Sequence, residues 1–285
     1  MPSTIDIRRR IRSVKNTQQI TKAMKMVAAA KLRRAQDRIF AARPYAAALR
    51  EVLASVARRV DVNAHPLLEQ RAESKVLVIV VTADKGLAGA FSANAIKGAI
   101  NAIRERHWQG AEIIPIGRKA NDFFKRRTFP IRRLVPNVFQ ALSLQTAKEI
   151  ADGLIKDFTS GEVDAVYVAF NEFRSVISQI VRVERLLPLA PLKDEPEQNE
   201  IDYLYEPSPE AILNDILPKH IEFQLYRTLL ESAAAEQGAR MTAMGAATKN
   251  ASEMIDHLTL TYNRIRQAAI TKEIIEIVSG AAAAQ

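Results

Sequence analysis

The stretch Asp84–Gly89, Asp-Lys-Gly-Leu-Ala-Gly, is the motif with the clearest chemical potential. It follows the apolar run Lys75–Thr82 and precedes a predicted helix over 92–106, which is where a phosphate-binding loop lies in α/β domains. Its glycines match neither G-x-G-x-x-G nor G-x-x-x-x-G-K-[ST], and no acidic residue stands at the end of the next predicted strand. We therefore predict a tight strand-to-helix turn and no bound nucleotide.

Other reactive residue types are not grouped in the sequence. The chain has no cysteine, which excludes disulfides, thiolate metal sites and cysteine nucleophiles. No pair among the four histidines has the spacing of metal ligands; they are His65, His107, His220 and His257. No nucleophile and base form a recognisable motif. We predict no catalytic residue, cofactor or metal site, and a protein that is not an enzyme.

Positive charge is concentrated at the N-terminal end. Residues 1–60 contain 15 Lys and Arg against 3 Asp and Glu, whereas residues 207–285 contain 7 against 9. The basic side chains include Arg8, Arg9, Arg10, Arg12, Lys15, Lys22, Lys25, Lys31, Arg33 and Arg34. They could form a solvated helix face, face an acidic protein surface or bind nucleic acid. Since no aromatic residue precedes Phe40 to stack on bases, nucleic-acid binding is the weaker alternative.

These basic residues lie on a predicted helix over residues 1–58. No proline occurs between Pro2 and Pro44, where a kink is expected, and residues with high helix propensity dominate. Apolar residues recur with a seven-residue period, defining a seam of positions that face a partner helix: 7, 11, 14, 18, 21, 25, 28, 32, 35, 39, 42, 46, 49, 53 and 56. Between residues 18 and 25 these positions are polar, and we expect the apolar stripe to shift to Ile20, Met24 and Val27.

The C-terminal segment, 207–285, shows a matching seam. It runs through Leu230, Ala234, Gln237, Met241, Met244, Thr248, Ala251, Ile255, Leu258, Tyr262, Ile265 and Ala269. Pro207 and Pro209 mark the start of this predicted helix and Gly280 its end, giving about 65 residues and about 100 Å at 1.5 Å per residue. We predict that the two terminal helices pack as an antiparallel, left-handed coiled coil.

Strands and helices alternate between the terminal helices. Strands are predicted at 75–82, 112–116 and 163–170, an edge strand at 178–186, and helices at 92–106, 118–126 and 144–158. This order is typical of a parallel-rich, Rossmann-like α/β domain. The predicted fold class is thus α/β plus coiled coil. Its divisions are an N-terminal helix at 1–58, a connection at 59–74, the α/β domain with an exposed tail at 75–206, and a C-terminal helix at 207–285.

The longest apolar run, Val76–Val81, is far too short to span a bilayer, so we predict no direct membrane insertion. The charged segment Met1–Arg10 lacks the apolar stretch of a secretory signal. We expect a mature N-terminus rather than a presequence.

Three segments carry a family resemblance that covers the whole chain. They are Asp6–Lys31 (DIRRRIRSVKNTQQITKAMKMVAAAK), Asp202–Pro209 (DYLYEPSP) and Tyr262–Ala281 (YNRIRQAAITKEIIEIVSGA). In this order they resemble the γ subunits of F-type ATP synthases. The resemblance implies a central stalk that turns inside a ring of α and β subunits, coupling rotation of the membrane c ring to ATP synthesis or hydrolysis.

The resemblance also implies contact residues. Those expected to meet the β subunits are Arg9, Arg10, Met24, Lys25, Arg33, Arg34, Arg266, Gln267 and Thr271. Those expected to meet the c ring or the ε subunit are Tyr203, Tyr205 and Glu206, although the two tyrosines could instead fold back on the α/β domain. One copy per complex is expected.

The chain lacks the cysteine-bearing insertion of chloroplast relatives, which favours a bacterial complex, with a mitochondrial one second. The expected location is the cytoplasmic face of the bacterial plasma membrane, as a peripheral protein. The alternative is a basic nucleic-acid-binding or scaffolding coiled-coil protein.

Overall fold

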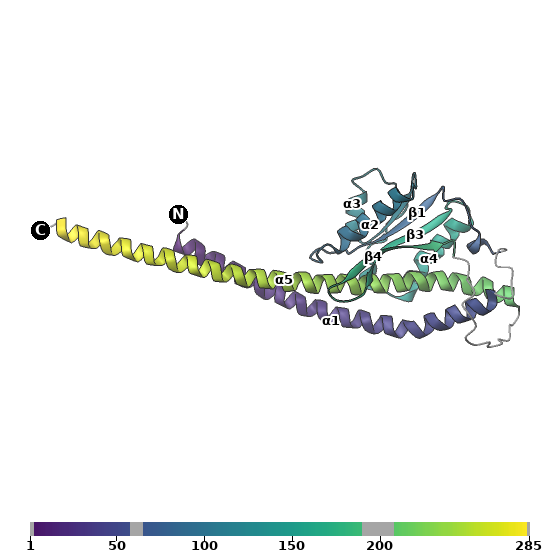
Figure 1. Cartoon of the computed structure of the whole chain (residues 1–285), viewed down its shortest axis with the longest axis horizontal. Helices are drawn as coiled ribbons and strands as arrows, with labels where there is room; N and C mark the ends of the chain where they lie inside the picture. Colours follow the sequence, from purple (N-terminus) through teal and green to yellow (C-terminus); the bar gives the residue numbers. More distant parts are fainter. Residues whose placement is uncertain (1–2, 58–64, 190–207, 284–285) are drawn as a thin grey trace. The chain divides into compact units, whose positions relative to one another are not determined.

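The computed structural model describes residues 3–57, 65–189 and 208–283 and contains two compact units. Unit 1 comprises Met1–Ala28 and Met241–Gln285, and unit 2 comprises Ala29–Arg240. Helices α1 (Thr4–Ala57) and α5 (Pro209–Ala283) contribute to both units. The predicted combination of long terminal helices and an α/β domain between them is confirmed (Figure 1).

Unit 2 contains a four-stranded sheet in the order β2-β1-β3-β4. Strand β1 (Val76–Val81) pairs in parallel with β2 (Glu112–Ile116) and β3 (Ala165–Phe173), and β3 pairs antiparallel with β4 (Gln179–Leu187). All six residues of β1 are buried, as its uniformly apolar sequence predicts for a central parallel strand. The predicted edge strand is confirmed as β4.

Helices cover both faces of this sheet because successive strand residues point to opposite sides. Helices α2 (Phe91–Glu105) and α3 (Arg118–Phe124) share a core with Val76, Val78 and Val80. On the other face, α4 (Leu144–Thr159) and parts of α1 and α5 share a core with Leu77, Ile79 and Val81 (Figure 1). Two short 3₁₀ turns, Pro66–Leu68 and Val138–Gln140, complete the described elements.

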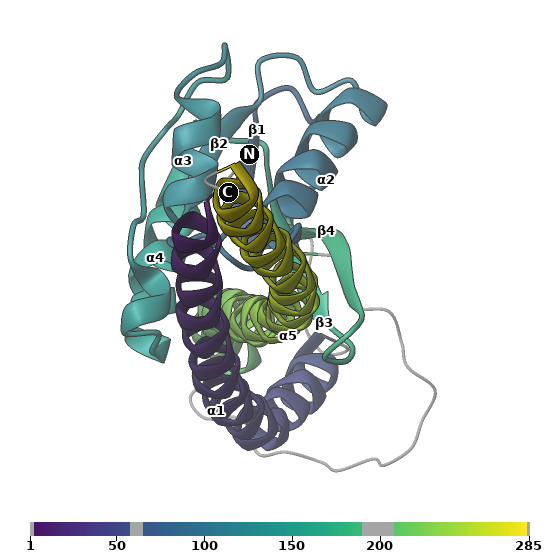
Figure 2. The ribbon, with the colours of Figure 1, turned by 90° about the vertical axis from the view of Figure 1, so that its left-hand side faces the viewer.

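The part of α1 in unit 2 packs along α5 through seam positions. Leu32, Leu49 and Leu53 are buried there, and the rings of Tyr45 and Phe223 lie with their centroids 5.1 Å apart. The helix continues through Pro44, the predicted kink position, and curves over its C-terminal part (Figure 2).

In unit 1 the two helices run antiparallel. Arg8 lies beside Tyr262 and Lys25 beside Gly245, so seventeen residues forward on α1 correspond to seventeen residues backward on α5. Seam positions on α5 are covered up to Ile265, and every residue from Arg266 to Gly280 is exposed. The yellow end of α5 therefore continues past the start of α1 (Figure 1). We call residues 266–283 the overhang.

The expected shift of the apolar stripe is wrong. Ile20 and Val27 are 59% and 56% exposed, whereas Thr21, at the original seam position, is only 8% exposed. The physical reason is a hydrogen bond, since Thr21 Oγ1 lies 2.8 Å from Thr248 Oγ1 on the opposite helix. A polar residue can occupy a buried seam position when a partner across the seam satisfies it.

Helix α5 is longer than predicted. It has 75 residues, against about 65, and it includes both Pro218 and Gly280. Glycine costs about 1 kcal/mol in a helix relative to alanine, too little to end a helix of this length by itself. The four-part division predicted from the sequence groups residues by element type, whereas the two units group residues by their contacts. The boundaries of the four parts therefore stay a prediction.

No helix among the described residues is long and apolar enough to cross a membrane.

Candidate functional site: the exposed faces of the paired helices

The Asp84–Gly89 loop is a packing element. The Asp84 carboxylate accepts hydrogen bonds from the backbone N–H groups of Arg118 at 3.2 Å and Asn137 at 3.3 Å. Ala83, Ala88 and Phe91 form a buried cluster with Ala235 of α5. The loop therefore joins the sheet to α5, and its acidic side chain is already engaged in holding the turn.

A groove of about 580 Å³ opens beside this loop, between α2 and α3. Four cationic side chains line it, from Lys85, Lys97, Arg104 and Lys119, together with apolar residues that include Ile96, Ile100 and Phe123. Sequence reasoning missed this groove because its cations are scattered over two helices and a loop. A surface of this kind can hold an anionic group beside an apolar one, but it presents no nucleophile with an adjacent base.

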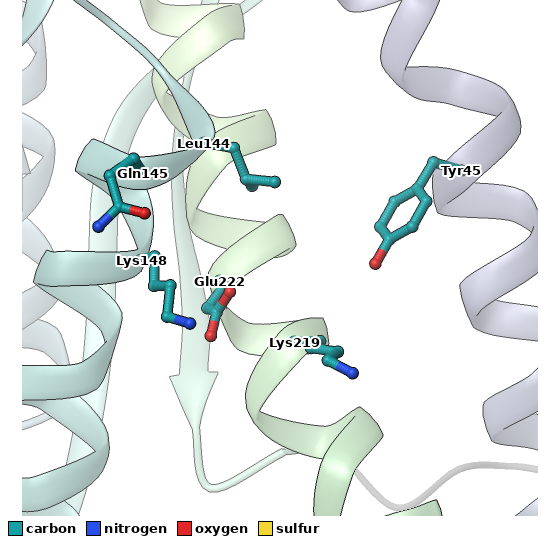
Figure 3. Close-up of a pocket in the computed structure, with 6 residues that line it drawn as sticks. All are labelled: Tyr45, Leu144, Gln145, Lys148, Lys219 and Glu222. Atoms are coloured by element: carbon teal, nitrogen blue, oxygen red, sulfur yellow. The ribbon is translucent and has the colours of Figure 1, made fainter.

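A second hollow, of about 420 Å³, lies where α1, α4 and α5 meet. Figure 3 shows the Lys148 amine pointing toward the Glu222 carboxylate, with Tyr45 across the gap. Burial raises the pKa of Glu222, and the charges of Lys148 and Lys219 oppose that rise. Two lysines and one glutamate carry the charges of its lining. Within the described ranges, no group of three or more His, Asp or Glu residues could hold a metal ion.

The residues expected to meet a β subunit do lie on helix surfaces. All of them are exposed except Met24, which is half-buried; the exposed ones are Arg9, Arg10, Lys25, Arg33, Arg34, Arg266, Gln267 and Thr271. An exposed cationic side chain keeps most of its hydration, so it can attract an acidic surface at long range without a fixed partner.

These residues are divided between the two units, and those in unit 1 do not form one patch. In unit 1, Lys25 lies fifteen residues from Arg10 along α1, which corresponds to about 22 Å. Arg266, Gln267 and Thr271 lie on the overhang, while Arg33 and Arg34 belong to unit 2. Any partner ring would therefore have to contact the helices at several levels. Tyr203, Tyr205 and Glu206 lie outside the described residues, so their contacts stay a prediction.

Arg8, in the same basic cluster, contacts the opposite helix of this chain. Its Nη2 donates a hydrogen bond to the Tyr262 hydroxyl at 2.7 Å, and its guanidinium lies 5.6 Å from the centre of the Tyr262 ring. Arg8 thus connects α1 to α5, unlike its neighbours Arg9 and Arg10. Sequence spacing alone could not separate these three arginines.

A buried ion pair on α5 was also missed. Arg240 Nη2 donates to Glu236 Oε1 at 2.6 Å, and both side chains are almost fully enclosed. Burial raises the pKa of Glu236; Arg240 opposes the rise, and the charges of Asp84 and Lys31 act in opposite directions. Three elements of unit 2, namely α5, α1 and the Asp84–Gly89 loop, therefore influence this carboxylate.

Comparison with known proteins relates this chain to one family. A family model described as ATP synthase matches residues 3–284. The "ATP synthase gamma chain" of Chlorobaculum tepidum is 52% identical over 99% of this chain and 98% of its own length. The gamma chain of Solibacter usitatus is 53% identical, with both chains fully covered.

Solved structures agree. A chain of the Tetrahymena thermophila mitochondrial ATP synthase central stalk and c-ring matches with a TM-score of 0.61 at 26% identity, covering 80% of this chain and 99% of its own. A chain of the Euglena gracilis mitochondrial ATP synthase matches with a TM-score of 0.68 over 98% of this chain and 94% of its own, and at 21% identity it supports the fold. With a family match over almost its entire length, this chain belongs to the ATP synthase gamma chain family.

Proposed function

We propose that this chain is the central rotor shaft of an F-type ATP synthase. The observation that carries the proposal is the match of about half of all residues to gamma chains along the full length. The antiparallel helix pair gives the shaft, and its exposed faces meet the α and β subunits. Rotation of the c ring turns the shaft, and the turning shaft changes the nucleotide sites of the α/β ring one after another. ATP hydrolysis reverses the rotation.

The chain performs no chemistry of its own in this proposal. Its two hollows are lined by more cationic than acidic side chains, and its buried ion pair joins opposite charges, which suits packing and docking. The c ring and the ε subunit are the remaining partners, with one copy of this chain per complex. Its location is the cytoplasmic face of a bacterial plasma membrane, where it binds as a peripheral subunit.

Charge asymmetry supports a rotating contact. Helix α1 carries the basic residues, whereas the segment 207–285 is close to neutral. Three equivalent β subunits around such a shaft would each face a different surface at any moment. Long-range attraction between exposed charges changes smoothly with angle, which suits sliding better than desolvated ion pairs do.

Rotation can be observed directly. The chain has no cysteine, so Gln109→Cys creates a unique attachment point at an exposed position beside the buried Trp108. A bead attached there should turn in one direction when the α/β ring is immobilised and given ATP. A matched sample without ATP should show only Brownian motion.

Failure of ATP-driven rotation in an assembled, hydrolytically active complex would contradict the proposal. Recovery of α, β and ε subunits with the tagged chain is the corresponding binding test. Salt-sensitive binding of duplex DNA with no subunit recovered would support the nucleic-acid alternative instead.

A further inference from the structure

The most exposed large apolar side chain among the described residues is that of Ile177, at 85% exposure. It lies in the tight turn of residues 174–178, which joins β3 to β4 in unit 2. A single exposed apolar residue is ordinary on a protein surface, so its exposure alone implies no partner. The geometry of the turn, and its place beside α5, do indicate one.

Hydrogen bonds within the turn hold its backbone in one conformation. The N–H of Ser175 donates to the Ser178 carbonyl at 3.0 Å, and the N–H of Ser178 donates back to the Ser175 carbonyl at 3.3 Å. The side-chain amide of Gln179 donates to the carbonyls of Ser175 at 3.1 Å and Val176 at 2.9 Å. Ile177 is therefore presented on an ordered support, which reduces the conformational entropy lost when a partner covers it.

The same turn lies against α5 within unit 2. A Cβ added at Gly238 would lie 3.3 Å from Cε2 of Phe173 and 3.5 Å from the carbonyl oxygen of Val176. The backbone of the helix and the base of the turn are thus in close contact, so a force applied at Ile177 reaches α5 directly. Gly238 precedes Met241, the first residue of α5 in unit 1, by three positions.

Two of the residues expected to meet β subunits lie at the same level of unit 2. The positive charge of Lys31 on α1 opposes the raised pKa of Glu236 on α5, so these two residues lie close together, near Gly238. Arg33 and Arg34 follow Lys31 within one helical turn, and both are exposed. Because a ring encloses a shaft on every side, a ring that meets these arginines also faces the turn, whatever the angle of rotation.

We propose that Ile177 contacts an apolar surface on the ring of α and β subunits, and that successive subunits of the ring meet it as the shaft turns. This inference rests on the proposed rotor function and adds a contact that lies outside the paired helices. An apolar side chain suits a moving contact because the hydrophobic effect is non-directional, so no fixed hydrogen bond or ion pair has to break at each step.

Photocross-linking of the assembled complex tests the contact. The chain has no cysteine, so Ile177→Cys creates a single site for a benzophenone maleimide, which is attached before the other subunits are added. Leu134→Cys is the matched control, because Leu134 is also an exposed apolar residue of unit 2 but lies outside the hairpin. Illumination should join the Ile177→Cys chain to an α or β subunit in at least tenfold higher yield than the control, and should stop ATP-driven rotation in the same fraction of complexes.

A second measurement needs no label. Ile177→Asp would place a charge in an apolar contact, so the amount of α and β subunits recovered with the tagged chain at limiting concentration should fall about tenfold relative to Leu134→Asp. Equal recovery with the two aspartate variants would overturn the inference.

The outcomes separate this inference from the rotor proposal. Complexes that assemble and rotate but join Ile177→Cys to no subunit, or only to the c ring or the ε subunit, would overturn the contact and leave the rotor proposal standing. Failure of every chain to assemble or rotate, the control and the native chain included, would contradict the rotor proposal and this inference with it.

Discussion

Gly117 is the residue whose type the fold constrains most. It lies between β2 and α3 with φ of 87°, and an added Cβ would be 2.1 Å from the Thr82 carbonyl oxygen. Gly110 has a similar φ of 74° but open space around its Cα. The two positions separate backbone strain from steric overlap.

Gly117→Ala should lower the free energy of unfolding by about 3 kcal/mol or more, because strain and overlap add at this position. Gly110→Ala should cost only about 1 kcal/mol, from the positive φ alone. Urea denaturation followed by circular dichroism measures both variants. Equal losses would show that the contact with Thr82 relaxes freely.

Met24 is the residue through which the proposed function can be tested most locally. It is half-buried on α1, whereas Met26, two positions away, is exposed on a different side of the helix. Met24→Lys in the assembled complex should reduce ATP-driven proton pumping more than it reduces ATP hydrolysis, because a new charge would bind the neighbouring subunit too tightly to slide.

Met26→Lys is the matched control and should leave the ratio of pumping to hydrolysis unchanged. Vesicle acidification and phosphate release, measured on the same preparation, give that ratio. A proportional loss of both activities in the Met24 variant would remove Met24 from the coupling surface.

At the scale of elements, the buried Glu236–Arg240 pair connects α5 to its surroundings in unit 2. Because the pKa of Glu236 is raised by burial, the folded state favours the protonated carboxyl more than the unfolded chain does. Its contribution to stability is therefore complete below the ordinary value of 4.5 and is lost as pH rises through the higher folded pKa.

Glu236→Gln imitates the protonated form at every pH. The variant should thus gain stability relative to the native chain as pH rises from about 4.5 to 7. Urea unfolding at several pH values measures the difference, and Glu253→Gln, at an exposed carboxylate on the same helix, should show no such trend. If the native chain instead became more stable relative to the variant as pH rises, the attraction of Glu236 to Arg240 would exceed the cost of burying the carboxylate.

The Asp84–Gly89 loop has the position of a phosphate-binding loop but serves in packing. In unit 2 the loop occupies the strand-to-helix turn of an α/β domain, yet its buried residues face Ala235 of α5. Nearby, a Cβ added at Gly238 would lie 3.3 Å from Cε2 of Phe173. Small residues on α5 let the sheet domain lie close to the helix.

At the scale of the whole molecule, the overhang is the part of α5 that α1 does not cover. It includes exposed apolar residues such as Ile270, Ile274 and Ile277. Truncation after Ile265 should change the free energy of unfolding by less than about 0.5 kcal/mol, because every residue from Arg266 to Gly280 is exposed.

Truncation after Met254 provides the comparison. It also removes Tyr262, the partner of Arg8, and the covered seam positions Ile255, Leu258 and Ile265. That variant should lose about 2 kcal/mol or more. Both are measured by urea unfolding of the full chain and the truncated chains. A large loss from the shorter truncation would mean that the overhang packs against other parts of the protein.

The sequence by itself determined the elements and the family. Period-seven apolar residues and the absence of helix breakers predict α1, while the uniformly apolar run Val76–Val81 predicts a central strand. Both signals are local, because each depends on the spacing of side chains along one element. The three segments that resemble the family identified it. The resemblance also implied the β-subunit contact residues, which lie on helix surfaces.

Only the tertiary structure decided which polar residues are internal. Thr21 is enclosed because Thr248 meets it from 227 residues away, and that partner leaves Ile20 and Val27 on the outside. Arg8 stays exposed, yet its hydrogen-bond partner Tyr262 lies 254 residues away, and the Asp84 carboxylate accepts from the backbone of Arg118 and Asn137. Whether a polar side chain is exposed or satisfied depends on a partner brought close by folding, and spacing along one helix contains no information about that partner.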